Sequence, residues 1–228
     1  MALQRYIQGS PGFRMDDIVL RKEIISTAMQ MVDSGLGVGA SGNISVRVEG
    51  GFLITPSGMK YSNLSPDDIV FVDFEGKASG TRKPSSEWRF HNDIYKSTSR
   101  AGAIVHAHPP YSTALACLGK EIPAFHYMVA VAGGDSIRCA GYHLFGTQEL
   151  SDAAIKALEE RKACLLANHG LIAHSETLEK AFSLALEVES IAQQYHLALQ
   201  VGTPTILSDE QMREVIERFK TYGENAQK

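Results

Sequence analysis

A short apolar run that ends in two histidines and two prolines constrains this chain more than any other stretch. Residues 103–105 predict a buried β-strand, and Pro109 and Pro110 end it because proline cannot donate a ladder hydrogen bond. Side chains at positions i and i+2 of a strand point the same way. His106 and His108 therefore leave the strand on one face, which suits either two metal ligands or a hydrogen-bonded core pair.

A second apolar run favours the metal. Residues 163–167 predict another buried strand, and His169 follows it in the sequence Asn168-His169-Gly170. Three histidines at strand ends, joined by a carboxylate from elsewhere, match a zinc site that keeps one position open for substrate.

The composition limits the classes of function. The 228 residues suffice for one domain with a sizeable core and are few for two. A net charge of −4 gives no reason to expect nucleic acid or an anionic membrane surface as partner. No apolar stretch is long enough for a membrane span, and residues 1–15 lack the pattern of a secretory signal. We expect one cytoplasmic domain over residues 1–228, with residues 1–14 as a flexible lead-in.

The rest of the pattern alternates strands with helices. Residues 44–48 and 52–55 predict a hairpin around a glycine turn, and residues 125–132 suggest a strand and a turn. Hairpins as well as helices between strands predict an α/β domain whose mixed, largely antiparallel sheet carries helices on its faces. The predicted helices cover residues 15–36, 85–99, 111–118, 147–161, the stretch that begins at 175–179, and 208–219.

Three small polar loops are candidate phosphate contacts. Each combines hydroxyls or backbone N–H groups with small residues, and the third precedes a helix N-terminus, which favours an anion. Singly, each loop can equally be a turn or a cap, so the accompanying metal site carries this interpretation. The absence of a GxxxxGK[ST] loop and of a GxGxxG turn after a strand argues against a nucleotide. The loops are Ser41-Gly42-Asn43, Pro56-Ser57-Gly58 and Pro84-Ser85-Ser86.

Glu87 is the most informative acid, because it lies in the first turn of the helix that follows the third loop. A glutamate there can be an exposed helix-end residue, or it can bind the metal and move a proton. His91 shares its helix face at i+4 and is a weaker ligand candidate. The isolated histidines are interpreted as structural or exposed: His126, His143, His174 and His196.

In their order and spacing, these motifs resemble the class II aldolase/adducin-head family, and most of all its bacterial L-fuculose-1-phosphate aldolases. The resemblance covers about residues 17–223 and rests on the combination of motifs. It implies a three-layer α/β/α domain in a homotetramer of C4 symmetry with sites between subunits. The motifs that carry it are Gly42-Asn43, Ser57-Gly58, Ser85-Ser86-Glu87, His106-Ala107-His108 and Asn168-His169-Gly170.

The resemblance also implies roles for individual residues. His106, His108 and His169 would bind Zn²⁺, or another divalent ion such as Mn²⁺ or Co²⁺, with Glu87 as fourth ligand and proton carrier. Tyr127 would help to place the aldehyde, Phe145 and Phe219 would line the aldehyde side, and Tyr222 would act as a base in the neighbouring subunit. The phosphate would contact Gly42, Asn43, Ser57, Gly58, Ser85 and Ser86.

The implied activity is reversible cleavage of a ketose 1-phosphate, such as L-fuculose 1-phosphate, into dihydroxyacetone phosphate and an aldehyde. The extra N-terminal stretch and the sequence His108-Pro109-Pro110-Tyr111 depart from the resemblance, which leaves 5-deoxyribulose or 5-methylthioribulose 1-phosphate as alternative substrates. Further alternatives are a pentulose-5-phosphate 4-epimerase, a methylthioribulose-phosphate dehydratase and a non-catalytic adducin head. The family's epimerases tend to have aspartate at the position of Glu87, and an adducin head would lack the metal ligands.

Overall fold

The described part of the chain, residues 15–220 of a computed structural model, is built on one eight-stranded sheet with the order β4-β3-β2-β1-β5-β8-β7-β6. All neighbouring strands are antiparallel except β6 and β7. The predicted mixed, largely antiparallel sheet is therefore confirmed. The strands are β1 Asn43–Val48, β2 Gly51–Ile54, β3 Val70–Asp73, β4 Ala78–Ser79, β5 Ala103–Ala107, β6 Cys139–Ala140, β7 Ala163–Leu166 and β8 Gly170–Ser175.

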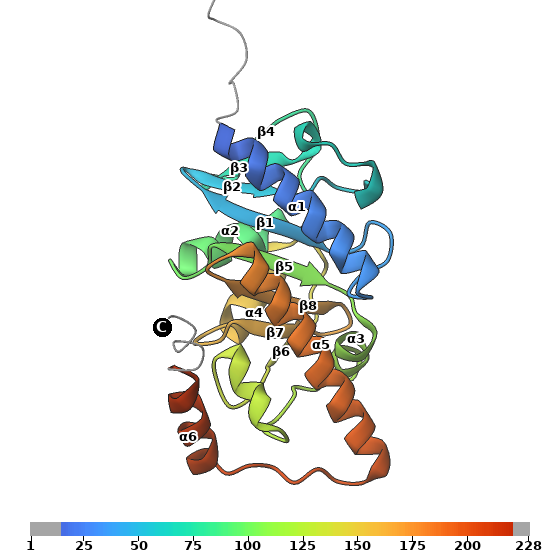
Figure 1. Ribbon diagram of the computed structural model, residues 1–228, viewed down its shortest axis with the longest axis vertical. Coiled ribbons are helices and arrows are strands. Elements are labelled where there is room, and N and C mark those ends of the chain that lie inside the picture. Colours follow the sequence, from blue (N-terminus) through green and yellow to red (C-terminus); the bar gives the residue numbers. More distant parts are fainter. Residues whose placement is uncertain (1–14, 221–228) are drawn as a thin grey trace, which may run out of the picture.

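Helices cover both faces of this sheet, so the predicted three-layer α/β/α arrangement is also confirmed (Figure 1). Side chains of α1, α3 and α5 pack on one face, and side chains of α2 and α4 pack on the other. The α-helices are α1 Met15–Asp33, α2 Trp88–Ser97, α3 Pro110–Cys117, α4 Gln148–Ala157, α5 Leu178–Val201 and α6 Asp209–Phe219, with 3₁₀ helices η1 Tyr61–Asn63, η2 Pro66–Asp68 and η3 Tyr127–Ala132.

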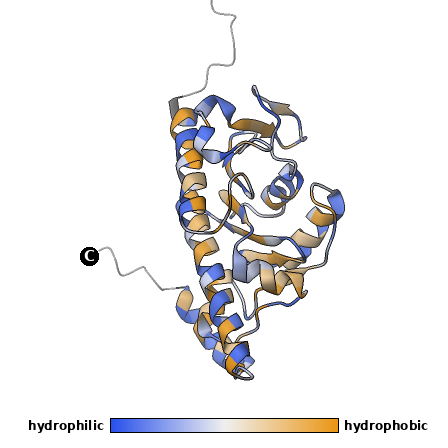
Figure 2. Ribbon diagram, turned by 90° about the vertical axis from the view of Figure 1, so that its right-hand side faces the viewer, coloured by the Kyte–Doolittle hydropathy of each residue, from blue (hydrophilic) through white to orange (hydrophobic). Residues whose placement is uncertain are grey.

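The two-residue period of the strands divides the core between these faces. In β5, Val105 points toward α1 and α5, whereas its neighbour Ile104 points toward α2. Both are fully buried, and each such aliphatic side chain contributes about 1.5–3 kcal/mol through burial. Figure 2 shows the helical layers from the side, with hydrophobic and hydrophilic residues alternating along the helices.

Most predicted elements are found, and three predictions need correction. Residues 125–132 contain η3 (Tyr127–Ala132) and not the predicted strand and turn, and they lie in a loop outside the sheet that an antiparallel bridge between Ile122 and Ile137 closes. The helix expected to begin near Ser85 begins at Trp88, since the bonds that join the two serine loops hold the preceding backbone extended. The helix expected over residues 147–161 ends at Ala157.

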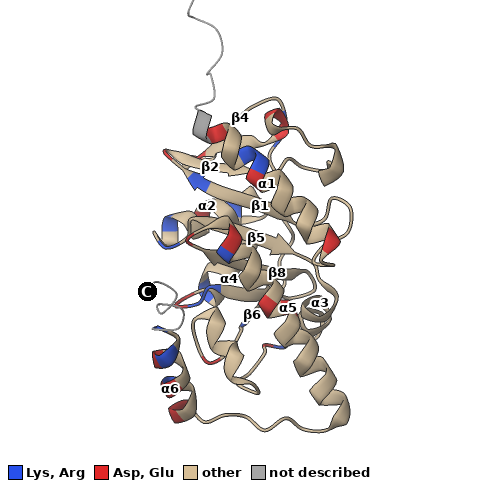
Figure 3. Cartoon of the chain, in the orientation of Figure 1, with Lys and Arg blue, Asp and Glu red and all other residues tan. Residues whose placement is uncertain are grey.

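Helix α6 carries both acidic and basic residues (Figure 3). Among the described residues, none of the helices combines the length and the apolar character required to span a membrane.

Candidate metal centre and phosphate cradle

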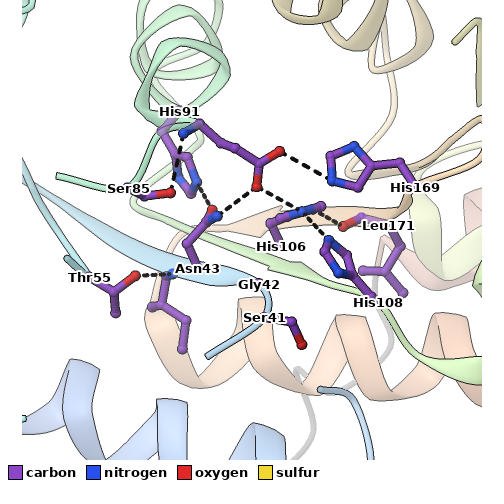
Figure 4. Close-up of polar contacts among 12 residues, drawn as sticks. Ser41, Gly42, Asn43, Thr55, Ser85, His91, His106, His108, His169 and Leu171 are labelled. Carbon is purple, nitrogen blue, oxygen red and sulfur yellow. Dashed lines mark hydrogen bonds and ion pairs between the residues drawn. The ribbon is translucent and has the colours of Figure 1, made fainter. Parts of the chain in front are cut away.

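Three histidines meet at the end of β5. His106 is the fourth residue of that strand, His108 follows its last residue, and His169 lies in the turn between β7 and β8. Because β5 pairs with β8, with His106 opposite Ile172, this turn lies beside the two β5 histidines. Their ring centroids are 4.7–4.9 Å apart, and Figure 4 shows the three rings turned toward one another.

The β7–β8 turn is tight, and the residues around His169 suit it. Asn168 has the left-handed backbone (φ 55°), which asparagine tolerates better than most residues. A Cβ on Gly170 would lie 2.3 Å from the carbonyl oxygen of Ala107, so only glycine lets β8 approach β5 this closely. The sequence Asn168-His169-Gly170 is therefore explained by the geometry that presents His169.

Glu87 reaches the histidines from the other side, as the N-cap residue of α2. Its backbone N–H donates to the Ser85 hydroxyl at 3.2 Å. Its carboxylate Oε2 lies 3.2 Å from His106 Nε2, and its Oε1 lies 3.2 Å from His169 Nε2. One ligand atom from each of Glu87, His106, His108 and His169 lies within 4.8 Å of the other three.

The hydrogen bonds fix which ring nitrogens can coordinate. His106 Nδ1 lies 2.8 Å from the carbonyl oxygen of Leu171, which can only accept, so Nδ1 carries a proton and Nε2 is the ring nitrogen that can coordinate a cation. That Nε2 lies 2.9 Å from His108 Nε2. Converging imidazole lone pairs beside a buried carboxylate fit a divalent cation. The predicted metal ligands thus form one set, and this set suits a divalent metal.

The protonation states agree with metal binding. Burial, followed by the neighbouring His106 and His169, lowers the pKa of His108 to about 3, so its imidazole is neutral. Burial would raise the pKa of Glu87, but His106 and His169 outweigh burial and hold that pKa well below its usual range. An ionised carboxylate and a neutral imidazole are the forms that bind metals.

A cavity of about 390 Å³ joins this cluster to the three polar loops. All six predicted phosphate contacts line it, together with Glu87, His108 and His169. The loops meet because Pro56 and Pro84 form an antiparallel bridge, in which Ser57 N donates to Lys83 O and Ser85 N to Thr55 O. Those two N–H groups are consumed and cannot contact an anion, whereas the serine hydroxyls can still donate. Among the described residues that line the cavity, none is lysine or arginine, which leaves neutral donors for an anion.

Gly42 is the predicted cradle glycine at which an added side chain would also collide with the metal-binding strand. It has φ +86°, and a Cβ there would lie 2.5 Å from the carbonyl oxygen of His106. The first loop can therefore pass over the metal-binding strand only with glycine at this position.

Comparison with known proteins shows which family this chain belongs to. Residues 22–196 match the sequence profile of the family described as Class II Aldolase and Adducin N-terminal domain. The chain belongs to this family. It is similar to a 5-methylthioribulose-1-phosphate/5-deoxyribulose-1-phosphate aldolase of Rhodospirillum rubrum, with 56% identity over 95% of this chain and 97% of that protein. It is also similar to the L-fuculose phosphate aldolase of Escherichia coli, with 50% identity over 90% of this chain and 95% of that protein.

A solved structure extends the likeness to three dimensions. An L-fuculose 1-phosphate aldolase superimposes with a TM-score of 0.87 and 42% identity, over 93% of this chain and all of that one. The predictions of the class II aldolase family, of its fold and of an aldolase are therefore confirmed.

The residues expected on the aldehyde side do not all lie at the cavity. Phe145 lines the cavity, at its exposed edge. Tyr127 is half exposed on η3, and Phe219 ends α6, which packs against η3; neither lines the cavity. Tyr222 lies outside the described residues. These roles stay predictions, and those of Phe219 and Tyr222 involve the active site of a neighbouring subunit.

Three other side chains lie at or beside this site. His91 is absent from the metal cluster and lies behind it, where Asn43 and Ser45 bind its ring nitrogens. Tyr142 and His143 line the cavity beside Phe145, although the sequence pointed to neither. The only sequence signal was their position in the loop that leads to Phe145 and Gly146.

Proposed function

We propose that this class II aldolase is metal-dependent and cleaves a ketose 1-phosphate reversibly into dihydroxyacetone phosphate and an aldehyde. The observation that carries the proposal is one cavity that joins a four-residue cation-binding set to a cradle of neutral phosphate donors. A ketose 1-phosphate has a phosphate on C1 and a carbonyl at C2. Its phosphate can therefore occupy the cradle while its carbonyl oxygen faces the cation-binding set.

Zn²⁺ is the proposed ion, with Mn²⁺ or Co²⁺ as substitutes. His106, His108, His169 and Glu87 would hold it, and three imidazoles with one carboxylate are a typical zinc donor set. When bound, the ion supplies a Lewis acid for the C2 carbonyl oxygen.

The chain's own residues then position the substrate and move protons. The cradle around Ser57 and Ser85 holds the phosphate, which fixes C2 and C3 relative to Glu87. Glu87 transfers the proton to and from C3 of the dihydroxyacetone phosphate half. On cleavage, the C4 hydroxyl gives its proton to a base, and Tyr222 of a neighbouring subunit is the proposed base. Tyr127 and Phe219 are proposed to complete the aldehyde side.

Two aldehyde halves are candidates. L-fuculose 1-phosphate follows from the relative with 50% identity, and the 5-deoxyribulose or 5-methylthioribulose sugar follows from the relative with 56% identity. These sugars share the phosphate-bearing half and differ beyond C4. The difference would fall on the exposed edge of the cavity, at Tyr142, His143 and Phe145.

A cytoplasmic homotetramer is part of the same proposal. The family resemblance suggests it, and so does an exposed apolar edge. Tyr142, Leu144 and Phe145 are each about 60% exposed beside the cavity, and apolar clusters of this kind often mark subunit contacts.

The direct test is release of dihydroxyacetone phosphate from fuculose, ribulose and 5-deoxyribulose 1-phosphates, with metal-replete and EDTA-treated protein. We expect EDTA-sensitive release from at least one sugar, and the ranking of kcat/KM identifies the aldehyde half. Absence of release from all three by metal-loaded protein would contradict the proposal and favour an epimerase or a dehydratase.

A further inference from the structure

A chain of buried polar side chains runs from α2 through β1 to Glu87. Tyr95 Oη lies 2.7 Å from Ser45 Oγ, and Ser45 Oγ lies 2.7 Å from His91 Nδ1. His91 Nε2 lies 2.5 Å from Asn43 Oδ1, and Asn43 Nδ2 donates to Glu87 Oε2 at 2.9 Å. Figure 4 shows Asn43 between His91 and the metal-site histidines.

The alternation of β1 explains why these residues meet. Ile44 and Val46 point to the core beneath α1 and α5, so Asn43 and Ser45 point toward α2. On α2, His91 follows Glu87 by four residues and so lies on the same face. A stripe of polar residues on the strand therefore meets a polar stripe on the helix.

The residues of this hydrogen-bonded series are buried, so each of their polar groups needs a partner within the protein. Ser45 and His91 are 0% exposed, Tyr95 is 2% exposed and Asn43 is 3% exposed. A buried polar group without a partner costs about 1–3 kcal/mol, so each donor must face an acceptor.

The Glu87 carboxylate at one end determines which group donates and which accepts in each hydrogen bond of this series. Ionised Glu87 only accepts, so Asn43 must turn its NH₂ group toward Glu87 and its oxygen toward His91. His91 must then donate from Nε2 and accept at Nδ1 from the Ser45 hydroxyl. Ser45 in turn accepts from Tyr95. Burial and the nearby His106 lower the pKa of His91 to about 3, which agrees with the neutral ring that this order requires.

We infer that His91 is a positioning residue for the metal site: its Nε2–H fixes the amide of Asn43, and the amide holds Glu87 Oε2 in place. If His91 presented a lone pair instead, Asn43 would turn its own oxygen toward the carboxylate, and two acceptors would face each other. His91 thus acts through Asn43 and touches no ligand atom itself. The inference rests on the proposed function, because it assigns the carboxylate to a metal.

Two variants separate this role from simple packing. Glutamine can place its amide N–H near the position of His91 Nε2, whereas asparagine reaches only the position of Nδ1. His91→Gln should therefore keep the donor to Asn43, and His91→Asn should lose it. Both replacements are amides, so they differ mainly in reach. His174→Asn and His174→Gln are the matched controls, since His174 is 4% exposed and bonds the Arg161 carbonyl.

The first measurement is release of Co²⁺ or Zn²⁺ from the full-length protein to a chelator, together with the visible spectrum of the Co²⁺ form. Outer hydrogen-bond partners of metal ligands commonly change affinity 10–100-fold. We expect His91→Asn to release metal about 10-fold faster or more and to shift the Co²⁺ bands, while His91→Gln restores most of both. Turnover should fall mainly in kcat, because His91 does not line the cavity.

The outcomes are distinct. The positioning role is wrong if His91→Asn releases metal at the wild-type rate with an unchanged Co²⁺ spectrum. It is also wrong if the two His174 variants change the release rate and the spectrum as much as the corresponding His91 variants do. If His91→Asn does not fold, Ser45→Ala replaces it: loss of the Ser45 donor should speed metal release in the same direction, and an unchanged rate would overturn the inference. Failure of the wild type to release dihydroxyacetone phosphate would count against the proposed function alone, because metal release does not depend on the sugar.

Discussion

The two ends of the cavity differ in how firmly the fold holds them. At the inner end, His106 is 0% exposed and Glu87 is 7% exposed, and strand pairing and buried hydrogen bonds position both. At the outer end, Tyr142 and Phe145 are each 62% exposed in the loop between β6 and α4. The inner end is part of the core, and the outer end is a surface.

Under the proposed function, this difference bears on the choice between the two candidate aldehyde halves. The half of the substrate that the inner end would hold is common to fuculose, 5-deoxyribulose and 5-methylthioribulose 1-phosphates. A change at the inner end disturbs a buried network, so the fold resists it. A change at the exposed edge disturbs little packing, so the fold tolerates substitutions there more easily. We therefore expect substitutions at the inner end to have larger effects than substitutions at the edge.

Glu87→Gln should give the largest effect. The replacement keeps the size of the side chain and lets its oxygen accept from Asn43, but it removes the charge and the proton carrier. General acid–base roles are worth about 10²–10⁴-fold, so we expect turnover to fall by 10³-fold or more. Circular dichroism should show an unchanged fold, and competition by inorganic phosphate should show a retained cradle. Near wild-type release of dihydroxyacetone phosphate would contradict the role of Glu87.

Gly42→Ala should be the next largest. A Cβ at residue 42 would lie 2.5 Å from His106 O, so the first cradle loop must move away from β5. Gly50→Ala is the matched control, since Gly50 also has positive φ (+77°) but nothing within 4 Å of the added Cβ. Backbone strain costs about 1–2 kcal/mol in both, and overpacking adds about 1–3 kcal/mol at residue 42 only. Denaturant unfolding should show the difference, and equal losses would refute the close approach.

The same contrast explains what the sequence could predict. The metal ligands were found because a strand end, a two-residue spacing and a tight turn leave few places for their side chains, as at His106, His108 and His169. The loops around Ser57 and Ser85 are recognisable as separate motifs, but only the Pro56–Pro84 bridge shows that they lie side by side and that two of their N–H groups are consumed.

What the sequence missed depends on contacts between distant segments. His91 looked like a weak metal ligand, because helix spacing relates it to Glu87 but cannot show that Asn43 and Ser45 of β1 face it. Residues 125–132 looked like a strand, because their apolar character is local, whereas the bridge that excludes them from the sheet is not. Tyr142 and His143 are exposed, and no periodic pattern marks an exposed edge.

Phe145→Ala should have a moderate effect that is confined to the outer end. Loss of the ring removes apolar contact with the aldehyde half, and differences of this kind are worth about 1–3 kcal/mol in specificity. We expect the ranking of the three sugar phosphates in kcat/KM to change about 10-fold while metal release stays at the wild-type rate. Leu118→Ala is the control, as Leu118 is also exposed (67%) but does not line the cavity. A faster metal release in Phe145→Ala would contradict the separation of the two ends.

Asp68→Asn should have the smallest effect, because this substitution removes a charge that lies outside the site. Arg82 Nε donates to Asp68 Oδ1 at 2.7 Å, and the Ser65 N–H and hydroxyl donate to Oδ2, which together lower the pKa of Asp68 to about 2 from 3.8. A lowered pKa means that the stabilisation is fully present above the unfolded pKa and is lost as the pH falls toward 2. Arg82 is half exposed, so solvent screening limits the pair to about 1 kcal/mol or less.

The free energies of unfolding of wild type and Asp68→Asn should therefore differ by a constant amount above about pH 5 and converge between about pH 4 and pH 2. The expected difference is small because solvent competes for this pair, whereas Glu87 meets its partners in the buried interior. Turnover of Asp68→Asn near pH 7 should equal that of the wild type, since Asp68 does not line the cavity. A difference that grew toward acid pH would reverse the sign assigned to this carboxylate, and a loss of turnover as large as that of Glu87→Gln would break the distinction between charges inside and outside the site.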